Sequence, residues 1–167
     1  LISKDVPVEF VPHFDDAESL DEEGQTALHM ALAEGDVAFV TPNIHLFKGS
    51  RDHAEVDDYG NIEAFYAIKN GYNVDVVKEV LSMVTPMLSV DEGDSLLIVS
   101  VQSGSVEIVQ AVIDAYVENA CYCGVDAVTY ANEAGKTALM YAIEAGNAEI
   151  IQLIRDAPAR VSEACNN

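Results

Sequence analysis

Residues 132–155 read NEAGKTALMYAIEAGNAEIIQLIR, and this stretch decides the fold of the chain. Two apolar segments lie on either side of Gly146, and a further glycine, Gly135, comes shortly before the first segment. Both segments place apolar side chains at the spacing of an amphipathic helix, and the first one starts near Thr137. Isolated helices need about 12–15 residues to be even marginally stable in water. We therefore expect this helix pair to pack against similar pairs elsewhere in the chain.

Three more stretches have the same arrangement of glycines, with the second glycine eleven residues after the first. The first glycines of the four units are Gly24, Gly60, Gly93 and Gly135, and the second glycines are Gly35, Gly71, Gly104 and Gly146. A repeat of this length is the signature of a solenoid, because a single helix pair cannot bury its apolar face alone. The chain of 167 residues is therefore predicted to be one domain of about four divergent repeats.

Each unit carries residues that are expected to begin and end its first helix. In three units a Thr or Ser stands two residues after the first glycine, where its side chain can cap the helix. The second glycine is expected to end the helix in the left-handed conformation that glycine adopts without strain. The predicted caps are Thr26, Ser95 and Thr137, and the apolar positions of the first helices are Leu28, Ala31, Leu32, Ala64, Ala67, Ile68, Leu97, Ser100, Val101, Leu139, Ala142 and Ile143.

This pattern resembles the ankyrin repeat, whose unit runs approximately D-x-x-G-x-T-P-L-H-x-A-A-x-x-G-x-x-x-I-V-x-x-L-L. The match is strong at DEEGQTALHMALAEGD (residues 21–36) and in the fourth unit, moderate in the third, and weak in the second, where Phe65 occupies the His position. The resemblance implies an all-α ankyrin-repeat solenoid of stacked helix-turn-helix units with connecting turns and loops. We expect an N-terminal cap over residues 1–20, an ankyrin-repeat domain over 21–157 with units starting near 21, 57, 91 and 132, and a C-terminal tail over 158–167.

Two stretches interrupt the repeat. Pro42 falls inside the expected second helix of unit one, and proline costs about 3 kcal/mol in a helix interior, so this helix should start late or end early. The interval 115–131 holds the extra residues before unit four. We expect the helix before it to continue past Tyr116, and Val128 and Tyr130 to alternate as in a short extended loop.

The large excess of acidic residues limits the chemical classes of partner that the chain can bind. There are 29 Asp and Glu against 8 Lys and Arg, for a net charge of −21. Nucleic acid and anionic membrane surfaces are disfavoured, because both are bound through Lys and Arg. A basic protein partner is favoured by electrostatic steering, although solubility or a salt-rich habitat explains the same charge. No apolar run reaches the roughly 18–20 residues that span a bilayer.

No residue pattern predicts catalysis, and we expect no enzyme, no cofactor and no metal site. The resemblance makes His29 a structural residue of the turn, and the remaining histidines His13, His45 and His53 have no neighbours at metal-ligand spacing. Glycine-rich phosphate-binding motifs are absent from the sequence.

The three cysteines and the first residue leave the compartment open. Cys121, Cys123 and Cys165 are an odd number, so free thiols and a disulfide from Cys165 to either of the other two are alternatives. Free cysteines fit a cytoplasmic protein. A chain that begins at Leu1 rather than Met also fits a processed, periplasmic or otherwise exported protein.

Ankyrin-like proteins contact their partners through residues that flank the first glycine and residues just before the second. Carried onto this sequence, the resemblance implies a mostly acidic partner surface that consists of Glu22, Glu23, Gln25, Glu34, Asp58, Tyr59, Asn61, Lys69, Glu92, Asp94, Gln102, Glu133, Lys136 and Glu144. Tyr59, together with Tyr66 and Tyr72, is a candidate aromatic anchor, since Tyr dominates many interfaces. Tyr122 and Tyr130 lie in the loop before unit four and are further candidates.

The sequence therefore predicts a protein-protein interaction module that is a monomer on its own. Its compact size and acidity suggest an inhibitor or immunity-type protein that blocks a basic protein or enzyme through the concave face and loops. Two alternatives stay open: an acidic protein that mimics nucleic acid, and a structural scaffold whose acidity serves solubility.

Overall fold

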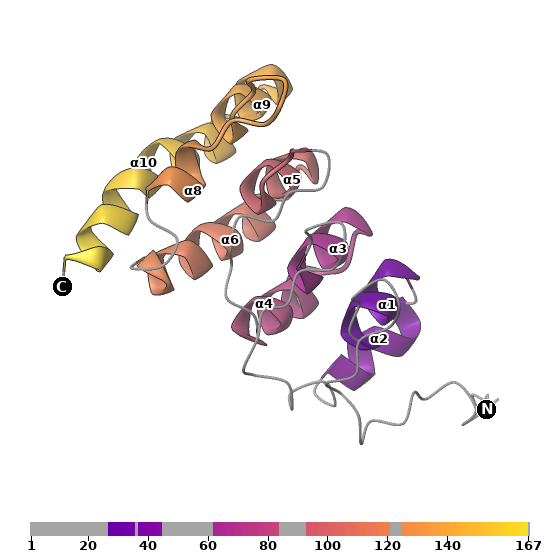
Figure 1. Ribbon diagram of the computed structural model, residues 1–167. Coiled ribbons are helices and arrows are strands. Elements are labelled where there is room, and N and C mark those ends of the chain that lie inside the picture. The colour runs from indigo at the N-terminus through magenta and orange to yellow at the C-terminus, as the bar shows by residue number, and fades with distance from the viewer. Residues whose placement is uncertain (1–26, 36, 45–61, 84–92, 121–124, 167) are drawn as a thin grey trace.

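The computed structural model of the chain describes residues 27–35, 37–44, 62–83, 93–120 and 125–166. These residues form pairs of helices that stack in chain order, from the pair at indigo to the pair at yellow in Figure 1. The helices are α1 Ala27–Ala33, α2 Val37–Asn43, α3 Glu63–Lys69, α4 Val74–Met83, α5 Leu96–Gln102, α6 Val106–Glu118, α8 Asp126–Thr129, α9 Ala138–Ala145 and α10 Ala148–Cys165.

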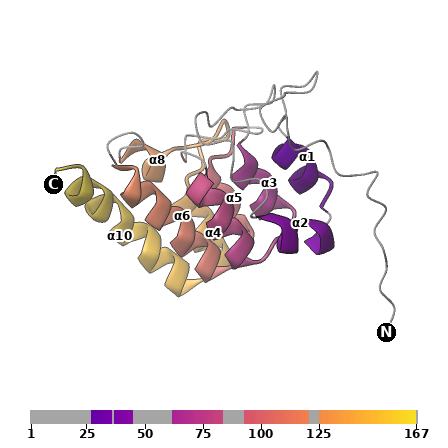
Figure 2. The ribbon, with the colours of Figure 1, turned by 90° about the horizontal axis from the view of Figure 1, so that it is seen from below.

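The stack has two layers of helices. The first helices of the units form one layer, in which α1 packs on α3, α3 on α5, and α5 on α9. The second helices form the other layer, in which α4 packs on α6 and α6 on α10, and both views show this order (Figure 2). The predicted all-α solenoid of helix-turn-helix units is confirmed.

Local signals begin and end the helices as the sequence predicts. The Ser95 hydroxyl accepts a hydrogen bond from the Ile98 N–H at 3.3 Å, and Thr137 caps α9 in the same way. The four second glycines, Gly35, Gly71, Gly104 and Gly146, have φ values of 72°, 74°, 75° and 70°. These positive values are the left-handed conformation that ends a helix, so both predictions are confirmed within the described units. Thr26 lies outside the described residues.

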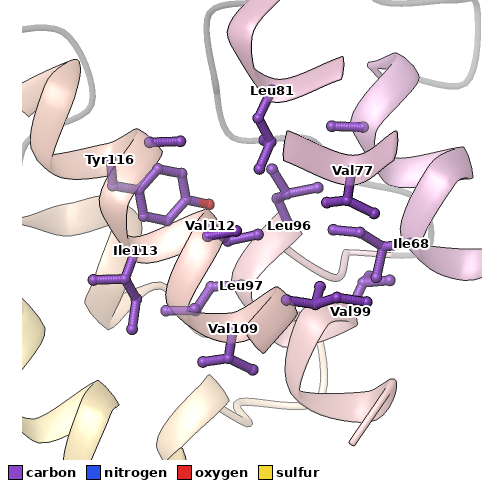
Figure 3. Packing of buried hydrophobic residues seen from close by; sticks show 14 of the residues in the cluster. Ile68, Val77, Leu81, Leu96, Leu97, Val99, Val109, Val112, Ile113 and Tyr116 are labelled. Carbon is purple, nitrogen blue, oxygen red and sulfur yellow. The ribbon is translucent and has the colours of Figure 1, made fainter. Parts of the chain in front are cut away.

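The core lies between the two layers and continues from unit to unit. Ile68 and Val77 of unit two belong to the same apolar cluster as Leu96 and Val112 of unit three (Figure 3). Small residues such as Ser100 are fully buried between first helices, where they allow close approach, and the Ser100 hydroxyl donates to the Leu97 carbonyl at 2.7 Å. Burying one large apolar side chain stabilises the fold by about 1.5–3 kcal/mol. The shared cluster therefore holds together helices that are individually too short to persist.

Hydrogen bonds across a unit boundary complete α1. The Asn70 amide donates to the carbonyls of Leu32 at 2.8 Å and Ala33 at 3.1 Å, and the Tyr72 hydroxyl donates to the Ala31 carbonyl at 3.2 Å. The last carbonyls of a helix have no partner within the helix itself. Unit two thus supplies the hydrogen-bond donors for the last carbonyls of α1 in unit one.

The interruptions of the repeat are partly as expected. Helix α2 ends at Asn43, one residue after Pro42, which confirms the predicted early end. Helix α6 continues to Glu118, past Tyr116, as predicted. The prediction of an extended segment at Val128 is wrong, because Val128 lies in α8 and is buried against the core. An alternation of two apolar residues did not distinguish a strand from a single helical turn.

Residues 158–165, the larger part of the predicted tail, are the last turns of α10. Pro158 removes one backbone hydrogen-bond donor from the helix. The apolar positions Ile150, Ile154, Ala157 and Val161 nevertheless follow helical spacing across it, and all are buried. Burial of this stripe, in a helix that packs on α6, keeps α10 continuous through the proline. The boundaries of the cap and of the repeat domain stay predictions.

The fourth unit differs from the others in one apolar position. Ile143 is 57% exposed, although the side chains at the same place in the earlier units are buried. Helix α9 is the last first-layer helix of the stack, and no described helix packs on its outer side. The helical pattern predicts which side chains share a face, but a neighbouring unit is needed to bury that face.

Candidate partner-binding surface

The structure describes half of the predicted partner surface. Its described members are Glu34, Lys69, Asp94, Gln102, Glu133, Lys136 and Glu144, which lie in the turns before the first helices or near the ends of those helices. The other predicted members, Glu22, Glu23, Gln25, Asp58, Tyr59, Asn61 and Glu92, lie outside the described residues. The described part of the surface therefore lies mainly on units three and four, and units one and two contribute one residue each.

Asn132 fixes the turn that carries Glu133 and Lys136. Its side-chain oxygen accepts hydrogen bonds from the N–H groups of Ala134 at 3.1 Å and Lys136 at 2.9 Å. The backbone of Asn132 pairs with that of Lys136, and Gly135 has a φ of 73° that closes the turn. An Asn or Asp side chain that bonds to the backbone ahead of it is a common way to stabilise a tight turn. Glu133 and Lys136 are thus presented by a turn with a defined backbone.

Asp94 of unit three is tied to unit four through the same asparagine. The Asn132 amide donates to Asp94 Oδ1 at 2.6 Å and also to the Tyr141 hydroxyl at 3.1 Å. The second oxygen, Asp94 Oδ2, accepts from Gln102 Nε2 at 2.9 Å. Two predicted site residues, Asp94 and Gln102, are therefore joined, and Asp94 also links two units. Sequence reasoning missed Asn132, whose position three residues before the first glycine was the available signal.

Lys136 and Glu144 form an exposed ion pair. The Lys136 ammonium donates to the two carboxylate oxygens at 2.8 and 2.9 Å and lies 5.1 Å from the centre of the Tyr141 ring. The hydrogen bond to Glu144 raises the pKa of Lys136 above its ordinary value. Exposed pairs of this kind contribute about 0–1 kcal/mol to stability, so their effect here is to orient the two side chains.

Lys69 of unit two lies over an aromatic ring. Its ammonium is 5.0 Å from the centre of the Phe65 ring, which is buried at the position that His29 occupies in unit one. A cation over the face of an aromatic ring is attracted by about 0.5–1 kcal/mol at an exposed site. The contact directs the Lys69 chain along the end of α3.

The tyrosines proposed as anchors do not share one environment. Tyr72 is 1% exposed and donates to unit one, so the prediction that it anchors a partner is wrong. Tyr66 is half-buried, and its ring meets those of His29 and Phe65 edge-on at 6.1 and 5.6 Å between centroids. Tyr130 is half-buried as well, whereas Tyr59 and Tyr122 lie outside the described residues.

His29 lies in the core, as predicted for a structural residue. It is fully buried, and its Nδ1 is 3.4 Å from Glu63 Oε1 of the next unit. The contact connects α1 to α3 and leaves the imidazole inaccessible to a ligand in solution. Among the described residues, no three His, Cys, Asp or Glu side chains gather in a cluster that fits a metal ion. Cys165 is exposed in the last turn of α10, and Cys121 and Cys123 lie outside the described residues.

A groove of about 470 Å³ runs between units two and three, beside the turns that join their helices. Apolar side chains of Ile68, Val74 and Ile108 line it together with polar groups that include Glu107. The Glu107 carboxylate accepts from its own backbone N–H and from the Ser105 hydroxyl at 3.0 Å, and these bonds lower its pKa. Glu107 therefore stays ionised to lower pH than an ordinary glutamate. The groove could not be predicted from the sequence, because it is formed by residues of two different units.

The described part of the partner surface carries a small excess of negative charge. It contains four carboxylates and two lysines. Two of the carboxylates, Asp94 and Glu144, already accept hydrogen bonds from neighbouring side chains. Glu34 and Glu133 are exposed, and no hydrogen bond to either carboxylate is present among the described residues.

The structure is a repeat solenoid. Its helix pairs stack on one another, a glycine follows the first helix of each pair, and the turns carry the residues of the partner surface. A family model described as ankyrin repeats in three copies matches residues 64–164, which is more than half of the chain. The chain therefore belongs to the ankyrin repeat family. The match includes the second unit, where the repeat pattern is weakest, and α1 and α2 form a further helix pair before it. No curated protein shows significant similarity to the chain.

Membership of this family indicates the general class of function. Ankyrin repeats are generally protein-protein interaction modules, so a protein is the expected kind of partner. Among the described residues, no helix is both long enough and apolar enough to cross a bilayer.

Proposed function

We propose that the chain is an acidic inhibitor or immunity-type protein that binds a basic protein through the partner surface and blocks it. The observation that carries the proposal is the net charge of −21, from 29 Asp and Glu against 8 Lys and Arg. A charge of this size attracts a basic partner over a longer range than any single contact and raises the rate of association. A solenoid adds a rigid, extended surface on which such a partner can dock.

The local contacts support a surface that is formed before the partner arrives. Asn132 holds the turn of unit four by hydrogen bonds, and Lys136 and Glu144 orient each other. Side chains that are ordered in advance lose less entropy on binding, which leaves more of the interaction energy for affinity. Glu34 and Glu133 are exposed on this ordered frame, where they are available to Lys or Arg of a partner.

The test is capture of the partner on immobilised full-length chain from an extract of the source organism, with elution by rising salt. Binding dominated by charge should weaken steeply as salt screens it. The captured protein is then purified, and its association rate is measured against a variant with Glu22→Lys, Glu23→Lys and Glu34→Lys. We expect association at low salt to slow by at least about tenfold, because steering falls with the charge on the docking face.

A matched control separates the partner surface from total charge. Glu118→Lys, Glu149→Lys and Glu163→Lys make the same change in net charge at exposed positions of the second-layer helices. We expect this control to slow association much less than the first variant. Equal rates for the two variants would contradict the proposed surface, and inhibition of the captured enzyme by the wild type supports a blocking role.

Competition with duplex DNA distinguishes an inhibitor from a nucleic-acid mimic. A mimic and DNA occupy the same site on the captured partner, so DNA should displace it. A partner that is indifferent to DNA would rule out mimicry while leaving the inhibitor proposal in place.

A further inference from the structure

The C-terminal end of the stack presents a face that resembles an interface between units. We call it the end face and define it by Met140 and Ile143 of α9 and by Ile151, Arg155 and Asp156 of α10. Met140 is 48% exposed and Ile143 is 57% exposed. In the interior units the residues at the position of Ile143 are Leu32, Ile68 and Val101, which are at most 3% exposed because the next unit covers them.

The end face also repeats a polar feature of the interface between units three and four. In that interface Gln110 Nε2 donates to Asp114 Oδ1 at 2.7 Å, and Arg160 Nη2 of α10 donates to the same oxygen at 2.6 Å. Helix α10 has the same pair one unit later, where Gln152 Nε2 donates to both oxygens of Asp156 at 2.9 Å. The Asp156 carboxylate is thus held as Asp114 is held, at a position where an arginine arrives in the interior of the stack.

The end face supplies an arginine of its own. Arg155 stands at the repeat position of Leu81 and Ile113, which are buried in helices that pack on the second helix of the following unit, so we place its side chain on the outward side of α10. Arg155 is exposed, and no carboxylate of the described residues lies within ion-pair distance of its guanidinium. A donor and an oriented acceptor therefore stand next to each other, beside an exposed apolar pair.

We propose that a second copy of this chain docks on the end face, related to the first by a two-fold axis. In such an isologous contact Arg155 of each copy meets Asp156 of the other, and the apolar side chains of the two α9 helices cover one another. A purely acidic or purely basic partner would meet a like charge at one of the two positions, whereas a second copy matches both. The chain is then a dimer, in contrast to the monomer that the sequence alone predicts.

Total charge and local contacts act in opposite directions in this dimer. Two chains of net charge −21 repel each other at long range, and salt screens that repulsion. The exposed Arg155–Asp156 contacts are individually weak, so apolar burial carries most of the association. Dimerisation is therefore expected to strengthen as NaCl rises from about 0.05 to about 0.3 M, where the Debye length falls below about 10 Å. Binding of a basic partner has the opposite salt dependence, so the two proposals fail independently.

The experiment is sedimentation equilibrium of the full-length chain over a range of concentrations. We expect a reversible monomer–dimer equilibrium. Ile143→Glu should raise the dissociation constant at least about tenfold, because it places a charge within the apolar contact. Val125→Glu is the matched control, since Val125 is also exposed and the change in charge is the same, at a place away from the end face. The control should leave the dissociation constant unchanged.

A charge exchange tests the two-fold geometry itself. Arg155→Asp and Asp156→Arg each place like charges opposite one another in a homodimer, and each should shift the equilibrium toward monomer at least about tenfold. An equimolar mixture of the two variants restores opposite charges at both contacts and should form a mixed dimer. A wild-type chain that is monomeric at every concentration overturns the proposal, as does a dimer that Ile143→Glu does not weaken. Failure of the mixture to dimerise also overturns it, and circular dichroism verifies that each variant is folded.

Discussion

Replacement of Asn132 by alanine should weaken the interaction between the third and fourth units. The side chain accepts two hydrogen bonds from the turn backbone and donates two more, to Asp94 and to Tyr141. A neutral hydrogen bond contributes about 0.5–1.5 kcal/mol net, and one to a charged group about 1.5–3 kcal/mol. The bond to exposed Ala134 is readily replaced by water. We therefore expect the loss to total about 2–4 kcal/mol, most of it from the bonds to Asp94 and Lys136.

Urea unfolding followed by circular dichroism measures this loss. With a slope of about 2 kcal/mol per molar urea, the middle of the usual range, the midpoint should fall by roughly 1–2 M. Solenoids can unfold one unit at a time, so hydrogen exchange should show the loss concentrated in α9 and α10. Asn166→Ala is the control, because the Asn166 side chain donates to the Ser162 carbonyl within the same helix, at the exposed end of α10. A shift for Asn132→Ala no larger than the shift for this control would refute the reasoning.

Asn132→Asp gives the same contact a pH dependence. The new carboxylate would replace an amide that lies 2.6 Å from Asp94 Oδ1, so two like charges would share one site. Such a pair keeps a proton to higher pH than a single carboxyl, which means that the pKa is raised in the folded state. A raised folded-state pKa contributes stability at low pH that is lost as pH rises through it. This variant should therefore regain stability on acidification, and a variant that does not would contradict the contact.

Two further predictions concern single side chains that end or begin helices. Asn70→Ala leaves two carbonyls at the end of α1 without their donor, and it should destabilise unit one by about 1–2 kcal/mol, seen as faster hydrogen exchange in α1 while α9 is unaffected. Ser105→Ala removes the cap from the Ile108 N–H and the hydroxyl donor to Glu107. It should cost about 1 kcal/mol in urea unfolding and return the pKa of Glu107 toward its ordinary value in an NMR titration; an unchanged pKa would show that the backbone bond alone lowers it.

The parts of the fold that depend on neighbouring residues in sequence were predictable. Ser95, Thr137 and the second glycines act within one turn of the chain, and their roles follow from backbone geometry alone. The early end of α2 at Pro42 is of the same kind.

The parts of the fold that depend on packing between units could not be predicted from the sequence. Tyr66 and Tyr72 are the same residue type a few positions apart, yet Tyr72 is almost fully buried and donates to unit one, whereas Tyr66 is only half-buried. Pro158 would end an isolated helix, but burial of Val161 keeps α10 intact beyond it. For the partner surface, the sequence shows that Asp94 carries a negative charge. It does not show that Asn132 and Gln102 donate hydrogen bonds to the Asp94 carboxylate.

The donors that complete α1 set an order for assembly. Helix α1 has only seven residues, and three of its last carbonyls accept hydrogen bonds from Asn70 and Tyr72. During synthesis α1 leaves the ribosome before Asn70 and Tyr72, which follow about forty residues later at a synthesis rate of about 5–20 residues per second. The nascent α1 must wait seconds for them. Helices α6 and α10 are longer and carry N-caps within their own units, so when the full chain refolds we expect these two helices to form before α1.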